Sequence, residues 1–346
     1  MLIPALFVAD AAKTYQSASR NEFDIIVFTE PADVDEGHRT WMRQRGIIHC
    51  DDMDVSDLSA SVIVQKRLTA ATLMKLRLAQ HLAGRYDKIL YLDADVTIHD
   101  DLSSIFSLDT GAFALAAVPA GRRWPSWLAA ERLKFVEHVR ALGMTEPYRF
   151  VNSGVLLIDV KKWNRDEIGP RTLSFIRRNA ELCYLPDEHG LNAVLDGRVA
   201  ELSLLWNLRP SFWQSSLLRA AISPVIIHYV GSAKPWKKFA YEKRLFDHRE
   251  AFHLYEAFVR ESPWPNWLDD QWTYRDLHDN LVYELRLITR RLRRKPSLSP
   301  TRRQRCLDDE DTWRYWQETR SADLDQGIVV REGAQLRLNQ CQVVAK

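Results

Sequence analysis

In the stretch over residues 88–96, a run of apolar residues is followed by two aspartates, Asp93 and Asp95. β-Forming residues without polar alternation are typical of a strand covered on both faces. Two carboxylates at the end of such a strand are costly unless they emerge at the sheet edge and meet a cation. The Asp-x-Asp pair offers two hard oxygen ligands, which suits a divalent metal that holds a diphosphate. An Asp-rich turn is the alternative.

Three further groups of polar residues stand beside apolar segments downstream. They are Asn152 and Ser153 in the segment 151–159, Asp187 and Glu188 where a loop opens into a helix, and His228 in the segment 225–231. Each alone has an ordinary explanation, as a turn residue, a helix start or a buried histidine. Because ligands of open α/β sheets bind outside the strand ends, their order along alternating strands predicts one common site.

The segment around His228 adds a third ligand and two phosphate contacts to this site. Histidine beside two carboxylates makes a mixed oxygen and nitrogen set, which favours Mn²⁺ ahead of Mg²⁺. Gly231 lets main-chain N–H groups approach a phosphate, and Lys234 neutralises phosphate charge. A solvated loop lysine is the alternative for Lys234.

Strands and helices alternate along the first two thirds of the chain with short links. This pattern predicts βαβ units, a mostly parallel sheet flanked by helices, and an α/β fold. The expected strands cover residues 23–29, 46–50, 88–96, 112–118, 151–159, 199–206 and 225–231. The expected helices cover residues 4–16, 38–45, 68–82 and 166–179, with a loop and helix over 122–144 and another helix from 188 to near 197.

Composition places the chain among ordinary globular proteins. Its 346 residues are 46% apolar and 27% charged, and a net charge of +2 gives no reason to expect nucleic acid as a partner. No signal-peptide pattern and no run of about 20 apolar residues occurs. The four cysteines lack pair spacing, which favours reduced thiols and a cytoplasmic location.

We expect a catalytic domain over 1–240, a helical basic extension over 241–320 and a tail over 321–346 that shows no strong pattern. Residues 283–295 form a basic amphipathic helix in this prediction, because arginines stand beside an apolar stripe. Such a helix binds the anionic inner surface of a membrane peripherally. A solvated surface helix or a cover over the acceptor is the alternative.

Four ordered motifs between residues 68 and 237 resemble glycosyltransferase family 8, retaining enzymes of GT-A fold that include glycogenin and bacterial lipopolysaccharide sugar transferases. The matching segments are 86–96, 151–159 with Lys162-Trp163, 187–192 with Trp206-Asn207, and 228–236. Four motifs in one order make a chance similarity improbable. The resemblance implies a GT-A fold with a mixed, mostly parallel sheet.

The resemblance also implies a role for each matching residue. Metal ligands fall on Asp93, Asp95 and His228, diphosphate contacts on Gly231 and Lys234, and donor contacts on Lys75, Asn152, Ser153 and Asp187. The implied metal is Mn²⁺, with Mg²⁺ as the alternative. The implied donor is a nucleotide sugar, UDP-glucose or UDP-galactose, and the implied acceptor is a glycan or glycolipid such as lipopolysaccharide.

Glu188 departs from the family pattern, which usually has glutamine at this position. A carboxylate here can act as the nucleophile of a double displacement. It can equally contact sugar hydroxyls in a front-face transfer, or simply begin a helix, where negative charge is favourable.

The start of the sequence departs as well, because Leu2 to Leu6 resemble the helix that follows the family's first strand. We do not find the first strand or its base-binding aspartate in this sequence. A start codon assigned too far downstream would explain their absence. If the strand is truly missing, we expect a catalytically impaired sugar-nucleotide-binding protein. An inverting Asp-x-Asp transferase or a nucleotidyltransferase is a further alternative.

Overall fold

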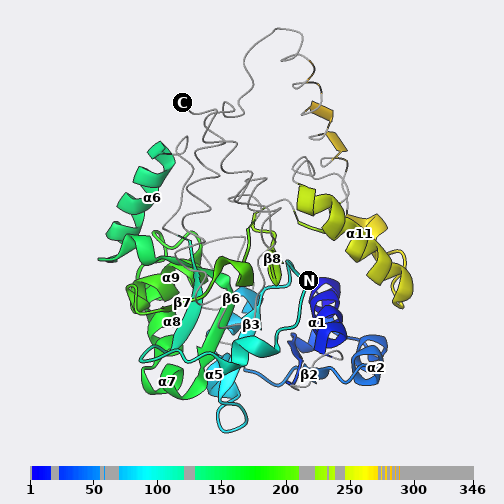
Figure 1. The fold of residues 1–346 in the computed structure, drawn as a ribbon, viewed down its shortest axis with the longest axis horizontal. Helices are drawn as coiled ribbons and strands as arrows, with labels where there is room; N and C mark the ends of the chain where they lie inside the picture. The colour runs from blue at the N-terminus through cyan, green and yellow to red at the C-terminus, as the bar shows by residue number, and fades with distance from the viewer. Residues whose placement is uncertain are drawn as a thin grey trace, which may run out of the picture.

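The computed structural model describes residues 2–16, 23–54, 58, 70–120, 129–209, 223–231, 234–237 and 246–271, with single positions between 274 and 288. The described strands lie in the middle of the molecule (Figure 1). Helices α7 (Val160–Arg165), α8 (Ile168–Arg178) and α9 (Pro186–Leu195) lie on one side of them. Helices α1 (Leu2–Gln16), α2 (Glu36–Gln44) and α11 (Phe246–Glu261) lie on the other. The predicted α/β fold is therefore confirmed.

The largest sheet has the strand order β3-β6-β5-β7. Its strands are β3 (Lys88–Leu92), β6 (Val151–Asp159), β5 (Leu115–Pro119) and β7 (Ala200–Glu201). Strand β6 is antiparallel to both β3 and β5, and β5 is parallel to β7. Three of the four strands therefore run in one direction, and β6 runs against them. This reversal brings the start of β6 to the carboxyl end of β3.

Two smaller sheets complete the described strands. Strands β1 (Ile26–Phe28) and β2 (Ile48–Cys50) pair parallel, and β4 (Val96–Ile98) pairs antiparallel with β8 (Ile226–His228). Within the described residues no strand precedes β1, and the chain runs as helix α1 from Leu2, as predicted for residues 4–16.

The prediction of a strand that ends in two aspartates is confirmed as far as Leu92, but Val96 does not belong to that strand. Strand β3 ends at Leu92, a turn holds Asp93 and Asp95, and β4 begins at Val96 in another sheet. Aspartate is depleted in strands, whereas turns accept it readily. The break matters for function, because Val96 then pairs with His228 and the histidine arrives beside Asp95.

The helix predicted over residues 68–82 is also broken. Helix α4 (Ala70–Met74) and helix α5 (Leu78–His81) are separated by a turn over 75–77, in which Leu76 N donates to Leu73 O and Arg77 N to Met74 O. Helix α8 packs directly against this turn, since a Cβ on Gly169 would lie 2.1 Å from Leu76 O. Residues 68 and 69 lie outside the described residues.

The strand predicted over residues 199–206 is shorter than expected. Within this segment only Ala200 and Glu201, strand β7, pair with β5, and a 3-10 turn follows over Leu204–Trp206. The Ser203 hydroxyl accepts a hydrogen bond from Leu205 N at 3.2 Å and so begins that turn. Local capping of this kind competes with strand pairing.

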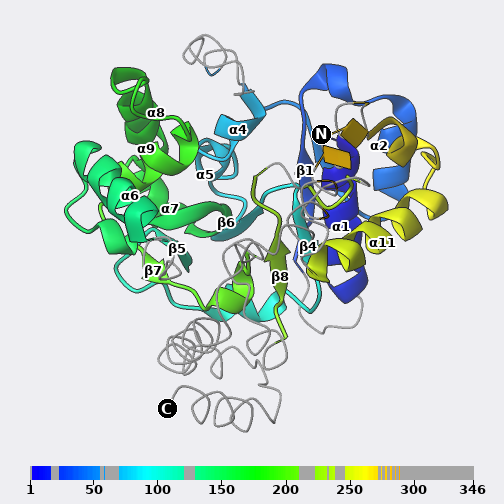
Figure 2. The same ribbon diagram turned by 90° about the horizontal axis from the view of Figure 1, so that it is seen from above.

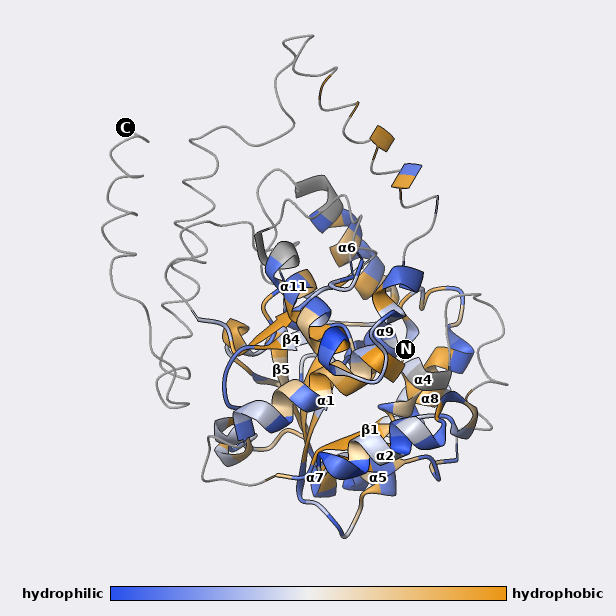
Figure 3. Cartoon of the chain, turned by 90° about the vertical axis from the view of Figure 1, so that its right-hand side faces the viewer, coloured by the Kyte–Doolittle hydropathy of each residue, from blue (hydrophilic) through white to orange (hydrophobic). Residues whose placement is uncertain are grey.

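The remaining elements follow the predicted order. They are α6 (Ala129–Ala141) within the predicted 122–144 segment, and the 3-10 turns Pro31–Asp33, Ser103–Ser107, Pro147–Arg149 and Trp267–Gln271. Apolar residues gather in the interior and polar residues on outer helix faces such as that of α2 (Figure 3). None of the described helices combines the length and apolarity that a membrane crossing requires.

Helix α11 lies beside α1 (Figures 1 and 2) and shares its hydrophobic core. The rings of Phe7 and Tyr255 stack at 3.8 Å between centroids, and Tyr255 is fully buried. The predicted boundaries at 240 and 320 stay predictions, because residues 238–245 and 289–346 lie outside the described part.

Candidate active site

The carboxyl end of β3 brings together the three predicted metal ligands. His228 Nε2 lies 3.1 Å from Asp95 Oδ1 and 3.8 Å from Asp93 Oδ2. One ligand atom from each of the three residues lies within 4.8 Å of the others. Two carboxylates and an imidazole at this spacing fit one divalent cation, and the mixed donor set suits Mn²⁺.

Gly154 makes this convergence possible. A Cβ built on it would lie 2.1 Å from His228 Cε1 and 2.8 Å from Asp93 Oδ2, so any other residue would displace the cluster. Its carbonyl also accepts a hydrogen bond from Asp93 N at 2.8 Å, which extends the β3·β6 pairing to the first ligand.

Asn207 orients the histidine and was not among the predicted site residues. Asn207 Nδ2 donates to Asn152 Oδ1 at 2.9 Å, which turns Asn207 Oδ1 towards His228 Nδ1 at 3.1 Å. Nδ1 then carries a proton, and Nε2 is the ring nitrogen that faces the two carboxylates. A proton on Nε2 serves as donor to Asp95, and a metal ion bound by the three residues takes the place of that proton. The signal for Asn207 was its place in the Trp206-Asn207 motif.

Lys234 forms an ion pair with Asp95, one of the predicted metal ligands. Its ammonium donates to Asp95 Oδ2 and, at 3.3 Å, to the carbonyl of Tyr229. Burial alone would raise the pKa of Asp95, but His228 and Lys234 hold that pKa well below its usual range. Asp95 is therefore ionised, which is the state that a metal ligand requires.

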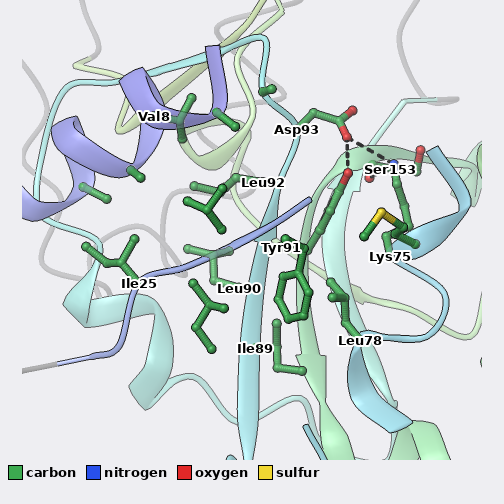
Figure 4. A pocket seen from close by; sticks show the side chains of 18 of the residues that line it. Val8, Ile25, Lys75, Leu78, Ile89, Leu90, Tyr91, Leu92, Asp93 and Ser153 are labelled. Carbon is green, nitrogen blue, oxygen red and sulfur yellow. Dashed lines mark hydrogen bonds and ion pairs between the residues drawn. The ribbon is translucent and has the colours of Figure 1, made fainter. Parts of the chain in front are cut away.

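Lys75 lies at the base of the site and joins its two halves. Its side chain is 2% exposed, and Nζ donates to Asp187 Oδ2 at 2.8 Å and to Asp93 Oδ1 and Ser153 O at 3.2 Å each. Tyr91 also donates to Asp93 Oδ1, at 2.5 Å (Figure 4). These contacts hold Asp93 with Oδ2 facing His228. Lys75 therefore contacts two carboxylates that line the predicted donor site, Asp93 and Asp187.

The charges of this buried pair support one another. Burial alone would lower the pKa of Lys75, but the Asp187 and Asp93 carboxylates raise it well above its ordinary value. Burial alone would raise the pKa of Asp187, but Lys75 and the Ser153 hydroxyl lower it. Both groups are thus ionised, and removing either would leave an uncompensated buried charge.

Glu188 stands beside this pair at the start of α9. Its Oε2 accepts hydrogen bonds from Asn152 Nδ2 at 2.7 Å and Ser153 N at 3.2 Å. Burial and the neighbouring Asp187 raise the pKa of the Glu188 carboxyl. The next residue, His189, is buried away from the cavity against His138 and Tyr184, and burial lowers its pKa to about 4.

A cavity of about 1410 Å³ opens over these groups. Its polar end is lined by Asp93, Asp95, Asn152, Ser153, Asp187, Glu188, His228 and Gly231. Gly231 has a φ of +89°, and a Cβ built on it would meet nothing within 4 Å, so a ligand has room to approach its backbone. Its apolar end runs along β3, β1 and α1, where Val8, Ile25 and Leu90 face one another (Figure 4).

A family model described as glycosyl transferase family 8 matches residues 5–240. The chain belongs to this family. The general stress protein A of Bacillus subtilis is 28% identical over 163 residues, which cover 43% of this chain and 52% of that protein. The lipopolysaccharide 1,2-glucosyltransferase of Escherichia coli is 29% identical over 186 residues, 51% of this chain and 50% of that protein. The chain thus spans about half the length of these relatives.

Solved structures carry the same fold. A crystal structure of the galactosyltransferase LgtC with donor and acceptor sugar analogues matches 73% of this family 8 chain and 92% of its own chain, with a TM-score of 0.58 at 24% identity. The predicted GT-A fold is therefore confirmed.

Proposed function

We propose that the protein is a metal-dependent retaining glycosyltransferase that moves a hexose from UDP-glucose or UDP-galactose to a glycan or glycolipid acceptor such as lipopolysaccharide. The observation that carries this proposal is the Asp93, Asp95 and His228 cluster at the mouth of the cavity. Membership of family 8 and relatives named as lipopolysaccharide glucosyltransferases support the reaction class and acceptor.

A Mn²⁺ or Mg²⁺ ion held by Asp93, Asp95 and His228 would supply Lewis-acid stabilisation of the departing diphosphate. Lys234 is the residue that we expect to change its contacts when a diphosphate binds. Its ammonium now neutralises Asp95, and a second cation on that carboxylate frees it to contact a phosphate oxygen. Backbone N–H groups at Gly231 would add neutral donors to the same anion, because the space beside its Cα is open.

We assign Asn152, Asp187 and Glu188 contacts with the transferred sugar, because all three line the cavity that also holds Asp93, Asp95 and His228. We assign Glu188 a contact with sugar hydroxyls in a front-face transfer. Its Oε2 already accepts hydrogen bonds from Asn152 and Ser153, which hold the carboxylate in place as a fixed hydrogen-bond acceptor.

The stereochemistry of the product tests the reaction class. The protein would be incubated with UDP-glucose or UDP-galactose, Mn²⁺ and truncated lipopolysaccharide, and the anomeric configuration of the product determined by NMR. Retention of the donor's α-configuration is expected. An inverted product would contradict the proposal and favour an inverting transferase.

A catalytically impaired sugar-nucleotide-binding protein is the second candidate. One observation favours it, because within the described residues β1 pairs with β2 alone and β3 with β6 alone, so the two sheets are not joined by a shared strand. This candidate predicts binding of UDP-sugars by calorimetry without release of UDP over hours, whereas the transferase releases UDP.

A further inference from the structure

A second group of metal-ligating side chains lies away from the cavity, at the end of the small β1·β2 sheet. It consists of Cys50, Asp52 and His81. Cys50 is the last residue of β2, Asp52 follows two positions later, and His81 ends helix α5. None of the three lines the cavity that holds Asp93 and Asp95. The role proposed for the cavity leaves this cluster unexplained.

The ligand atoms have the spacing of three corners of a small tetrahedron. Cys50 Sγ lies 3.0 Å from Asp52 Oδ1 and 3.3 Å from His81 Nε2, and the latter two atoms lie 3.5 Å apart. Zn–S bonds of about 2.3 Å and Zn–N and Zn–O bonds of about 2.1 Å give tetrahedral separations of about 3.6 Å to sulfur and about 3.4 Å between nitrogen and oxygen. The separation between His81 Nε2 and Asp52 Oδ1 already matches, and Cys50 Sγ has to move away by about 0.3 Å from His81 and by about 0.6 Å from Asp52.

The surroundings hold two of the ligands in place and leave the third corner open. Cys50 is buried, and its carbonyl accepts a hydrogen bond from Thr29 N at 3.1 Å. The His81 ring packs edge-on against Phe28, with an interplanar angle of 81°. The Asp52 side chain is 79% exposed, so solvent can reach the cluster and supply a fourth ligand.

We propose that Cys50, Asp52 and His81 bind a Zn²⁺ ion that joins strand β2 to helix α5, with water as the fourth ligand. Thiolate and imidazole select zinc over the oxygen-preferring ions, which suit the Asp93 cluster better. On binding, the Cys50 S–H bond breaks, its proton passes to solvent, and the sulfur electron pair binds the metal. The ion fixes α5 directly after the turn that carries Lys75.

Cobalt substitution tests the site in the full-length chain after treatment with a chelator. Co²⁺ bound by a thiolate gives a near-ultraviolet sulfur-to-metal charge-transfer band, which the Asp93 cluster cannot produce because it contains no sulfur. We expect one equivalent of Co²⁺ to produce this band and Zn²⁺ to abolish it. A wild-type protein that shows no band would overturn the proposal.

Matched variants locate the site. Cys50→Ser should lose the band, and His81→Gln should weaken Co²⁺ binding by more than about 100-fold, since even outer-shell partners are worth 10–100-fold. Cys183→Ser, at the other cysteine of the described chain, and Cys306→Ser with Cys341→Ser should keep the band. A band that survives in Cys50→Ser would overturn the assignment.

Two further readouts separate a metal site from a hydrogen-bonded cluster. Zn²⁺ should raise the melting temperature of the wild type and leave that of the Cys50→Ser variant unchanged. The positive charge of Arg85 acts on both Cys50 and Asp52. Arg85→Gln should therefore tighten Co²⁺ binding several-fold. Unchanged melting and unchanged affinity would contradict the proposal.

Discussion

Asn207 fixes the orientation of His228 beside Asp93 and Asp95. Among the described residues its side chain forms hydrogen bonds with Asn152 and His228 and not with either aspartate. It holds the Nδ1 proton of the histidine and is itself held by Asn152. Outer partners of this kind fix the tautomer and orientation of a ligand, and their loss costs about 10–100-fold in metal affinity.

Asn207→Ala should therefore raise the Mn²⁺ concentration that gives half-maximal UDP release by about 10–100-fold, while circular dichroism stays native. Asn179→Ala is the matched control, because that amide bonds only to the carbonyl of Phe175. An unchanged Mn²⁺ requirement in Asn207→Ala would show that the amide does not position the ligand.

Glu188 gives a prediction with a definite pH dependence. Its pKa is raised in the folded protein, so folding is weakened as pH rises from the ordinary value of 4.5 through the raised one, and the penalty persists above it. Glu188→Gln should be more stable than the wild type above this window and equally stable below it. Urea unfolding at several pH values measures this, with exposed Glu137→Gln as control. A pH-independent difference would contradict the assigned cause.

The residues of the candidate metal cluster could be predicted from sequence, because Asp93 and Asp95 come directly after an apolar strand and His228 ends another. The partners of the lysines could not. Contacts of Lys75 and Lys234 with the donor stay predictions, but their ion pairs with Asp187 and Asp95 were not foreseen. Such contacts join residues more than 100 positions apart, and no local pattern encodes them.

At the scale of elements, the turn between α4 and α5 is what delivers Lys75 to the carboxylates. Leucines and alanines over 68–82 predict an unbroken helix, because helix propensity registers only local preference. The break depends on a tertiary contact in which Gly169 of α8 lies against Leu76 O. The antiparallel direction of β6 and the short length of β7 could not be predicted from the periodicity of apolar residues either. That periodicity indicates a strand but not the direction in which the strand runs.

Gly169→Ala should consequently lower the free energy of unfolding by about 1–3 kcal/mol, as overpacking does in a tight interior. It should also reduce turnover, because the turn that carries Lys75 has to move. Gly37→Ala in α2 is the control, where a Cβ meets only the movable Asp35 side chain at 3.1 Å. If Gly169→Ala unfolds at the same urea concentration as the wild type, the turn does not depend on this contact.

At the scale of the whole molecule, α11 belongs physically to the core of α1. Tyr255 packs on Phe7, and its hydroxyl reaches the carbonyl of Ala94 between the two aspartates at 3.3 Å. The sequence showed the change to helical texture near residue 241 but gave no sign of where that helix packs. The predicted catalytic domain over 1–240 therefore depends on a helix beyond its boundary.

Tyr255→Ala should destabilise the protein by about 3–5 kcal/mol, the usual cost of removing a large buried aromatic side chain. Tyr274→Ala, at an 83% exposed position, should change stability little. Thermal unfolding of both variants measures the difference. Equal melting temperatures would mean that α11 contributes nothing to the fold.

The central claim is that Asp93, Asp95 and His228 hold the metal that drives UDP release. The most direct test is the rate of UDP release from UDP-glucose or UDP-galactose against Mn²⁺ concentration, in the wild type and in Asp95→Ala. We expect saturable, EDTA-sensitive release in the wild type and a rate at least 100-fold lower in the folded variant. The same Mn²⁺ dependence in Asp95→Ala would contradict the account.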